Sequence, residues 1–262
     1  MIVTFNLSIV IWSYKRGDGA LAVTLPGWLT FANALELKLY VATDSEELSY
    51  ANKLMFSKSN WRQEWEEVLG QLKERGVQQF ISLLDDFYVL SSPYKFDASL
   101  LLTTFKEHEL SYLALEPHPS TSSLYDKFIG RRRGLVYREL DRGSLYSSSL
   151  RPSLWTLKLF EETLMSATDI WRFENVRLES YKYASICCRK DQIKCVHLLE
   201  KGKLNYNIIH LSMRELLFLF RNYNYDFVQI LKLPKILLSN LIIKLVGYRF
   251  HNVLYNYRNT RI

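Results

Sequence analysis

Glycine, proline, cysteine and histidine are all scarce in this chain of 262 residues, which has ten, six, three and five of them. Low glycine and proline contents, together with 48% hydrophobic residues, exclude fibrous and disordered classes of protein. The chain is long enough to bury a sizeable core as one domain, or as one domain with an appendage. The composition therefore predicts a globular protein.

Long apolar runs are missing as well. No uninterrupted apolar segment reaches the roughly 18 residues that a membrane-spanning helix needs. The run from Ile9 to Trp12 is short, and Lys15 and Arg16 follow it, whereas a secretory signal places its basic residues first. We therefore expect neither a signal peptide nor a transmembrane helix in this sequence.

The three cysteines, Cys187, Cys188 and Cys195, lie close together with His197 nearby. A metal cluster is conceivable there, but the spacing matches no usual zinc site. Reduced structural thiols are the favoured interpretation, and they favour the cytosolic side of a cell. The five histidines form no triad or metal spacing, so we expect ordinary surface or core residues.

Sequence signatures of P-loop, dinucleotide-binding, serine hydrolase and zinc protease sites are absent. The formal net charge of +7 favours anionic partners such as nucleotide phosphates, anionic lipid or nucleic acid. Lysines and arginines are spread along the chain without a DNA- or RNA-binding motif. We therefore expect no nucleic-acid partner.

Apolar runs alternate with amphipathic segments over the first 115 residues. Pro26-Gly27 predicts that the first helix is short, while Asn60 (or Ser59) and Asp97 are predicted helix N-caps. This alternation predicts an α/β fold with a Rossmann-like, mostly parallel sheet flanked by helices. The expected strands cover 7–13, 37–43, 80–90 and 110–115, and the expected helices cover 20–29, 60–76 and 97–108.

The second half is predicted in less detail. Residues 120–151 are predicted to form a loop, whose basic cluster Gly130–Gly134 is either a solvated surface or a phosphate- or acceptor-binding loop. Helices are expected at 153–165 and 213–220, and a helix or turn opens at 169–174. We assign residues 1–211 to the main domain.

Residues 212–262 are expected to form a helical, basic C-terminal extension. Its mixture of aromatic, aliphatic and basic residues suits an anionic membrane surface. The alternative is a set of helices that packs on the main domain or on a second subunit.

The run Phe80–Leu90 is apolar or aromatic except for an acidic pair, Asp85-Asp86. A carboxylate within a buried strand is costly unless a cation satisfies it. Ligands collect at the carboxyl ends of strands in open α/β sheets, so the pair is a candidate metal or phosphate site. The alternative is that the pair begins an ordinary turn.

Five sequence blocks follow one another along this chain. They are a Trp-bearing helix, a strand ending in an acidic pair and an aromatic residue, an S-L-x-x-x-L/I-W block, a W-x-F-E block and a Gly-Lys pair. They read Trp61 to Leu72, Leu83 to Phe87, Ser149 to Trp155, Trp171 to Glu174 and Gly202-Lys203. In the order of these blocks, the sequence over roughly residues 7–205 resembles a group of bacterial glycosyltransferases of surface-polysaccharide biosynthesis.

The resemblance implies the glycosyltransferase A fold, a Rossmann-like sheet that binds a sugar nucleotide, usually with Mg²⁺ or Mn²⁺ held by an Asp-x-Asp type motif. Asp85 and Asp86 would take that motif's place, although here they are adjacent. Since successive side chains on a strand point to opposite faces, Asp86 is expected to reach the metal while Asp85 holds ribose or a loop. Glu174 matches the acidic base of such enzymes, which implies an inverting displacement. The alternative is a carboxylate that favours a helix N-terminus.

Further donor-site candidates follow the first two strands. Contacts with uracil or a related base are expected from Ser13, Tyr14, Arg16, Asp18 and Asp44. Pyrophosphate or acceptor phosphate is expected to meet Arg151, Lys203 and Arg131–Arg133.

These features predict a glycosyltransferase on the cytosolic face of a membrane, acting on a polysaccharide or lipid-linked acceptor. One alternative is a nucleotidyltransferase of similar fold, which uses the same metal chemistry. The glycine-rich signature usual in such enzymes is weak in this sequence. Another is a non-enzymatic module that binds a membrane or another anionic partner. Catalysis would involve Asp86 and Glu174, with a hydroxyl proton passing to a carboxylate.

Overall fold

The computed structural model describes residues 7–14, 18–57, 60–90, 97–115, 127–132, 135–140, 148–186, 193, 195–200, 203–204 and 211–223. By packing, the chain divides into two compact units, residues 1–197 and 198–262. The division predicted at 211/212 stays a prediction.

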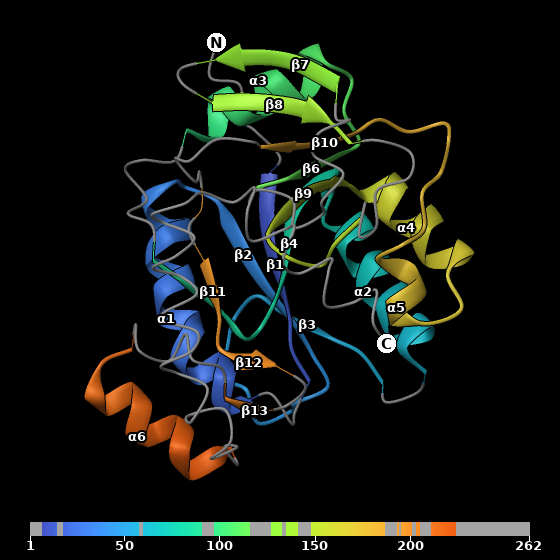
Figure 1. The fold of residues 1–262 in the computed structure, drawn as a ribbon. Helices are drawn as coiled ribbons and strands as arrows, with labels where there is room; N and C mark the ends of the chain where they lie inside the picture. Colours follow the sequence, from blue (N-terminus) through green and yellow to red (C-terminus); the bar gives the residue numbers. More distant parts are fainter. Residues whose placement is uncertain are drawn as a thin grey trace, which may run out of the picture. The chain divides into compact units, whose positions relative to one another are not determined.

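A nine-stranded sheet organises the described part of the first unit (Figure 1). Its strand order is β3-β2-β1-β4-β9-β6-β10-β8-β7. Strands β8 and β9 run antiparallel to their neighbours, and all other pairs are parallel. The sheet is therefore mostly parallel in strand direction, as predicted. The strands are β1 Leu7–Trp12, β2 Lys38–Thr43, β3 Lys53–Met55, β4 Gln79–Leu84, β6 Tyr112–Ala114, β7 Lys127–Arg132, β8 Leu135–Glu139, β9 Ser153–Thr156 and β10 Tyr183–Ile186.

Helices cover both faces of this sheet, with α1 on one face and α2, α4 and α5 on the other (Figure 1). A small second sheet pairs β5, Phe87–Val89, with β11, Cys195–His197. The helices are α1 Asp18–Ala34, α2 Trp61–Glu74, α3 Ala98–Glu107, α4 Leu157–Ser166 and α5 Ile170–Phe173.

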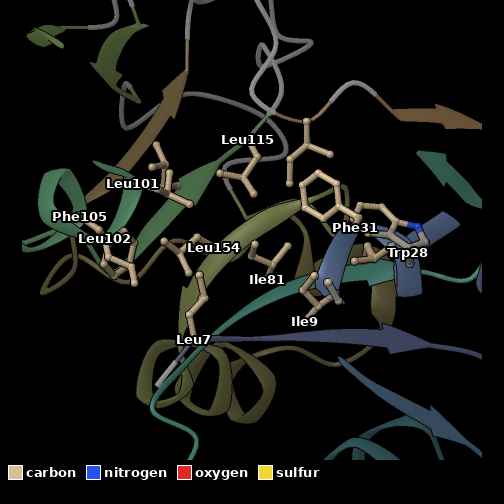
Figure 2. Close-up of a cluster of buried hydrophobic side chains, with 14 of the residues drawn as sticks. Leu7, Ile9, Trp28, Phe31, Ile81, Leu101, Leu102, Phe105, Leu115 and Leu154 are labelled. Atoms are coloured by element: carbon tan, nitrogen blue, oxygen red, sulfur yellow. The ribbon is translucent and has the colours of Figure 1, made fainter. Parts of the chain in front are cut away.

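Alternating side chains of β1 feed two different cores, because successive residues of a strand point to opposite faces. Ile9 and Ile11 enter a largely aliphatic cluster with α1 and α3 (Figure 2). Val10 and Trp12 enter a cluster rich in aromatic rings with α2, α4 and α5. The sheet is thus buried on both sides, as a doubly wound fold requires.

Helix α1 is longer than the sequence predicted. It runs for 17 residues and continues through Pro26, which we expected to keep it short. Proline removes one backbone hydrogen bond, but Trp28 and Phe31 beyond it are buried in the aliphatic core. Burial of two large side chains outweighs the lost bond. A Cβ on Gly27 would lie 3.0 Å from Val89 Cγ1, so glycine permits α1 to approach β5 closely.

The helix predicted over 153–165 was confirmed from Leu157 onward and was wrong before it. Residues 153–156 form β9, and α4 begins at Leu157 after the N-cap Thr156. Leu154 and Trp155 pair with both β4 and β6 in the centre of the sheet. Tertiary pairing here overrides the local preference for helix.

The loop predicted over 120–151 was also wrong in part. Residues Arg131 and Arg132 belong to β7, which pairs antiparallel with β8. Arg133 lies outside the described residues. Part of the basic cluster is therefore on an edge strand.

In the second unit, β12, Leu199–Glu200, pairs antiparallel with β13, Lys203–Leu204. Helix α6, Met213–Asn222, begins at a capping box formed by Ser212 and Glu215, which confirms the helix predicted over 213–220. Residues 224–262 of the predicted extension lie outside the described residues. Within the part of the chain that is described, no helix is long and apolar enough to cross a membrane.

Candidate functional site

The strand predicted over 80–90 is interrupted by a turn at Asp85-Asp86, between β4 and β5. This turn lies where the parallel strands β1, β2 and β4 end. Strand β1 pairs with β2 on one side and with β4 on the other, so the direction of winding reverses between β1 and β4. Open α/β sheets bind ligands at such a reversal point.

Asp85 is tied to the end of β1 and to α1. Ser13 Oγ donates to Asp85 Oδ2 at 2.7 Å, and the Asp85 N–H donates to the carbonyl of Trp12 at 3.0 Å. The Thr24 hydroxyl donates to the Asp85 carbonyl at 2.6 Å. Since the pair occupies a turn, the strand alternation that we expected to separate Asp85 from Asp86 does not apply.

Asp86 is 9% exposed, and its two oxygens differ. Oδ2 lies 2.7 Å from His197 Nε2. Oδ1 is buried and accepts no hydrogen bond from any residue that the structure describes. A buried carboxylate oxygen without a partner is costly. Asp86 therefore has one oxygen held by His197 and one whose burial no described residue offsets.

His197 was missed by the sequence reasoning, which treated it as an ordinary residue. It lies opposite Phe87 in the β5–β11 pair, and its ring stacks on Phe87 with centroids 4.8 Å apart. The alternation in Cys195-Val196-His197 is a weak strand signal. No local pattern in the sequence links this short strand to Asp86.

Glu174 follows α5 and is held at the same edge of the sheet. Its Oε1 accepts from the Leu150 N–H at 2.9 Å and from Ser149 Oγ at 3.2 Å. These donors directly precede β9, which is antiparallel, so its amino end lies beside the carboxyl ends of β4 and β6. Glu174 is the C-cap of α5, and the helix N-terminal alternative was wrong.

Buried polar groups fix the segment before β9. Tyr112 accepts from the Ser149 N–H at 3.1 Å, and Ser153 Oγ donates to the Arg151 carbonyl at 2.6 Å. Complete burial raises the pKa of Tyr112 well above its usual value. Its hydroxyl therefore stays neutral and positions Ser149, which in turn holds Glu174.

The predicted donor-site residues lie in several parts of the chain. Ser13 and Asp85 are in contact, Asp44 directly follows β2 at the same edge, and the exposed Arg151 lies beside Ser149. Tyr14 donates its hydroxyl to Glu64 on α2 at 3.0 Å. Asp18 is the first residue of α1, Lys203 lies on β13 in the second unit, and Arg16 lies outside the described residues.

The Asp86 carboxylate fits a hard divalent cation. Mg²⁺ often binds through one or two carboxylates and completes its shell with water and substrate phosphates, and Mn²⁺ prefers the same oxygen ligands. Among the described side chains, no group of three His, Cys, Asp or Glu residues could hold a metal by itself. Asp86 Oδ1, helped by Asp85, would hold the ion only together with oxygens from water or a ligand.

Comparisons with known proteins give no family. No family model matches the chain, and no curated protein matches it. Among solved structures, the crystal structure of A197 from STIV is similar over 75% of this chain and 88% of its own, with a TM-score of 0.39 and 11% identity.

Proposed function

We propose that this chain is a glycosyltransferase that moves a sugar from a nucleotide-sugar donor to a hydroxyl of a polysaccharide or lipid-linked glycan. The observation that carries the proposal is the turn at the β1/β4 reversal point, where one buried oxygen of Asp86 has no hydrogen-bond partner among the described residues. A nucleotide diphosphate brings both the cation and the phosphate oxygens that such a group needs.

In this proposal Asp86, with Asp85 beside it, holds Mg²⁺ or Mn²⁺ at the donor diphosphate. The ion supplies charge neutralisation for the leaving nucleotide diphosphate. Ser13 and Thr24 fix Asp85, and His197 fixes Asp86. Ser13, Tyr14, Asp18 and Asp44 contact the nucleoside, while Arg151 meets phosphate. The phosphate contact predicted for Lys203, which belongs to the second unit, stays a prediction.

Glu174 is the proposed base, and its position at the same edge supports this role. The acceptor oxygen forms a bond to the anomeric carbon, the bond between that carbon and the diphosphate oxygen breaks, and the hydroxyl proton passes to Glu174. Direct displacement inverts the anomeric configuration. The Ser149 and Leu150 donors hold the carboxylate in one orientation for this step.

Thermal unfolding of the full chain with UDP, GDP and CMP, each with and without Mn²⁺, tests the donor site. One nucleotide is expected to raise Tm in a Mn²⁺-dependent way, and the matching nucleotide-sugars to be hydrolysed slowly. A nucleotide triphosphate consumed with release of pyrophosphate would instead identify the nucleotidyltransferase alternative. If no nucleotide changed Tm, the remaining alternative would be a non-enzymatic module that binds a membrane or another anionic partner.

Helix α6 supports the membrane part of the proposal. Met213, Leu217 and Phe220 recur at helical spacing and are exposed, as is Phe218. Arg214 and Arg221 are exposed beside them, and residues 212–262 contain eight Lys and Arg against two Asp and Glu. Apolar and basic groups on one helix suit an anionic lipid surface, at the cytosolic face where lipid-linked acceptors would lie.

Vesicle co-sedimentation tests this docking. The full chain is expected to bind phosphatidylglycerol vesicles more tightly than phosphatidylcholine vesicles, and Leu217→Glu to weaken binding. Concentration-dependent dimerisation that is lost in Leu217→Glu, without vesicle binding, would assign the face to a second copy.

A further inference from the structure

Trp171 on α5 is 68% exposed. Among described residues of the first unit, Met165 is the other exposed large apolar side chain. The remaining tryptophans each contact another aromatic ring, whereas Trp171 has no ring contact within the described residues. The ring-packed tryptophans are Trp12, Trp28, Trp61, Trp65 and Trp155.

The backbone that carries Trp171 is fixed on both sides. Asp169 caps α5 by accepting from the Arg172 N–H at 2.9 Å, and Asn175 Nδ2 donates to the Trp171 carbonyl at 2.8 Å. Phe173 is fully buried and packs against Trp65, Trp155 and Phe160. Exposure of the indole is therefore a property of an ordered turn, and it leaves apolar area in water at a cost.

Trp171 also lies close to the candidate base. Glu174 has helical backbone angles at the end of α5, and residues three apart on a helix are neighbours on its surface, about 5–6 Å apart between Cβ atoms. The Glu174 carboxylate is anchored at the sheet edge that carries Asp85 and Asp86. A group stacked on Trp171 would therefore lie next to the stretch of backbone that carries Glu174.

We propose that Trp171 is the platform on which a pyranose ring of the acceptor glycan stacks. The axial C–H bonds of a sugar carry partial positive charge, which the negative face of an indole attracts. The exposed Arg172 and Asn175 beside it supply donors for sugar hydroxyls. This inference rests on the proposed function for the role of Glu174, but carbohydrate binding at Trp171 can be measured without it.

The test is 19F NMR of the full chain labelled with 5-fluorotryptophan, in which Trp171→Phe identifies the Trp171 resonance among six. Methyl glucoside, methyl galactoside, N-acetylglucosamine and lactose are added at millimolar concentration. At least one is expected to shift the Trp171 resonance. If none does, or if phosphatidylglycerol vesicles shift it instead, the inference is overturned.

Separate arms with UDP, GDP and CMP distinguish this inference from the proposed function. Nucleotide binding without a saccharide response at Trp171 overturns the platform and leaves the transferase. A saccharide response without any nucleotide binding supports the platform and overturns the transferase.

With an identified acceptor, Trp171→Ala is expected to raise the acceptor KM about ten-fold, since a good aromatic contact contributes on that order. The donor KM and donor hydrolysis stay unchanged, and Trp171→Tyr recovers most of the loss. Met165→Ala is the matched control, because Met165 is also exposed and its removal should change none of these values. An equal effect of both variants would overturn the inference.

Discussion

Two carboxylates lie at the edge of the sheet where β1, β2 and β4 end, and they are held in opposite ways. Asp86 is nearly buried, with one oxygen beside His197 and the other without a partner in the described structure. Glu174 is half-buried, and two donors converge on a single oxygen. Asp86 therefore keeps an oxygen that a cation could bind, whereas the Glu174 carboxylate is held in one orientation.

In the proposed function, this difference separates a ligand-binding group, Asp86, from a group that acts by its position, Glu174. An unpaired buried oxygen gains most when a cation arrives. A carboxylate oriented by neighbouring donors can meet a hydroxyl at a defined angle while its other oxygen remains for the proton. The two groups can also be told apart by experiment, because substitution of Asp86 should impair metal-dependent nucleotide binding, whereas substitution of Glu174 should impair transfer alone.

The largest effect is expected from Glu174→Gln. The amide oxygen can still accept from Ser149 and Leu150, so the fold should be retained, but a neutral amide cannot take the proton. Transfer should slow by about 10²–10⁴-fold, with the nucleotide Kd unchanged, as measured by single-turnover transfer and nucleotide titration. Glu174→Ala, which also removes the acceptor, is the companion variant. Full activity in Glu174→Gln would show that the Glu174 carboxylate has a structural role only.

Asp86→Asn should cost somewhat less in rate, about 10²–10³-fold, but it should also abolish the Mn²⁺-dependent nucleotide stabilisation. The substitution keeps the shape of the side chain and removes its charge. Thermal shift with nucleotide and Mn²⁺ measures it. Glu109→Gln is the control, because Glu109 is a surface carboxylate paired with Lys182, 2.7 Å away. If Asp86→Asn were still stabilised by nucleotide in a Mn²⁺-dependent way, the metal site would not be at Asp86.

His197→Ala is expected to have a smaller effect, since in the proposed site His197 supports Asp86 and does not itself bind the donor. Loss of such a supporting partner typically weakens metal affinity by about 10–100-fold. Titration with Mn²⁺ at saturating nucleotide measures the change. His197→Gln, whose amide nitrogen matches the position of Nε2 and can still donate to Asp86, should recover part of it. Equal Mn²⁺ affinities in the unsubstituted protein and both His197 variants would show that the contact with His197 does not contribute to metal binding.

The smallest effect concerns Asp169, the cap of the turn that carries Glu174. The hydrogen bond from the Arg172 N–H lowers the pKa of Asp169. A carboxyl whose pKa is lowered by folding stabilises the fold above its unfolded value of about 4 and loses that contribution as pH falls through the folded value. Asp169→Asn keeps the cap without titrating. Urea unfolding at pH 3 and pH 6 should show a smaller loss on acidification in this variant, and identical losses would contradict the assignment.

Much of the fold could be predicted because the signals are local. The apolar run that became β1, the amphipathic spacing of Trp65, Val68 and Leu72 in α2 and the Asp97 cap of α3 all specify their elements within a few residues. Position at the carboxyl edge of the sheet then follows from the alternation of strands and helices. Asp85 and Asp86 could therefore be located from the amino-acid sequence alone.

The remaining features depend on contacts between distant parts of the chain. Trp155 belongs to a strand because β4 and β6 lie on either side of it, and no neighbouring residue indicates this. Pro26 is tolerated within a helix because the side chains around it are buried. His197 reaches Asp86 only through the pairing of β11 with β5.

That last pairing has a consequence for how the protein is made. Asp86 and His197 are more than a hundred residues apart along the chain, and chains emerge and fold from the amino end during synthesis. Strands β1, β2 and β4 can associate early, whereas the partner of Asp86 is synthesised only after β10. The nascent protein can therefore form the strands that precede Asp85 and Asp86 before His197 is available, and the candidate donor site is completed late in the synthesis of the first unit.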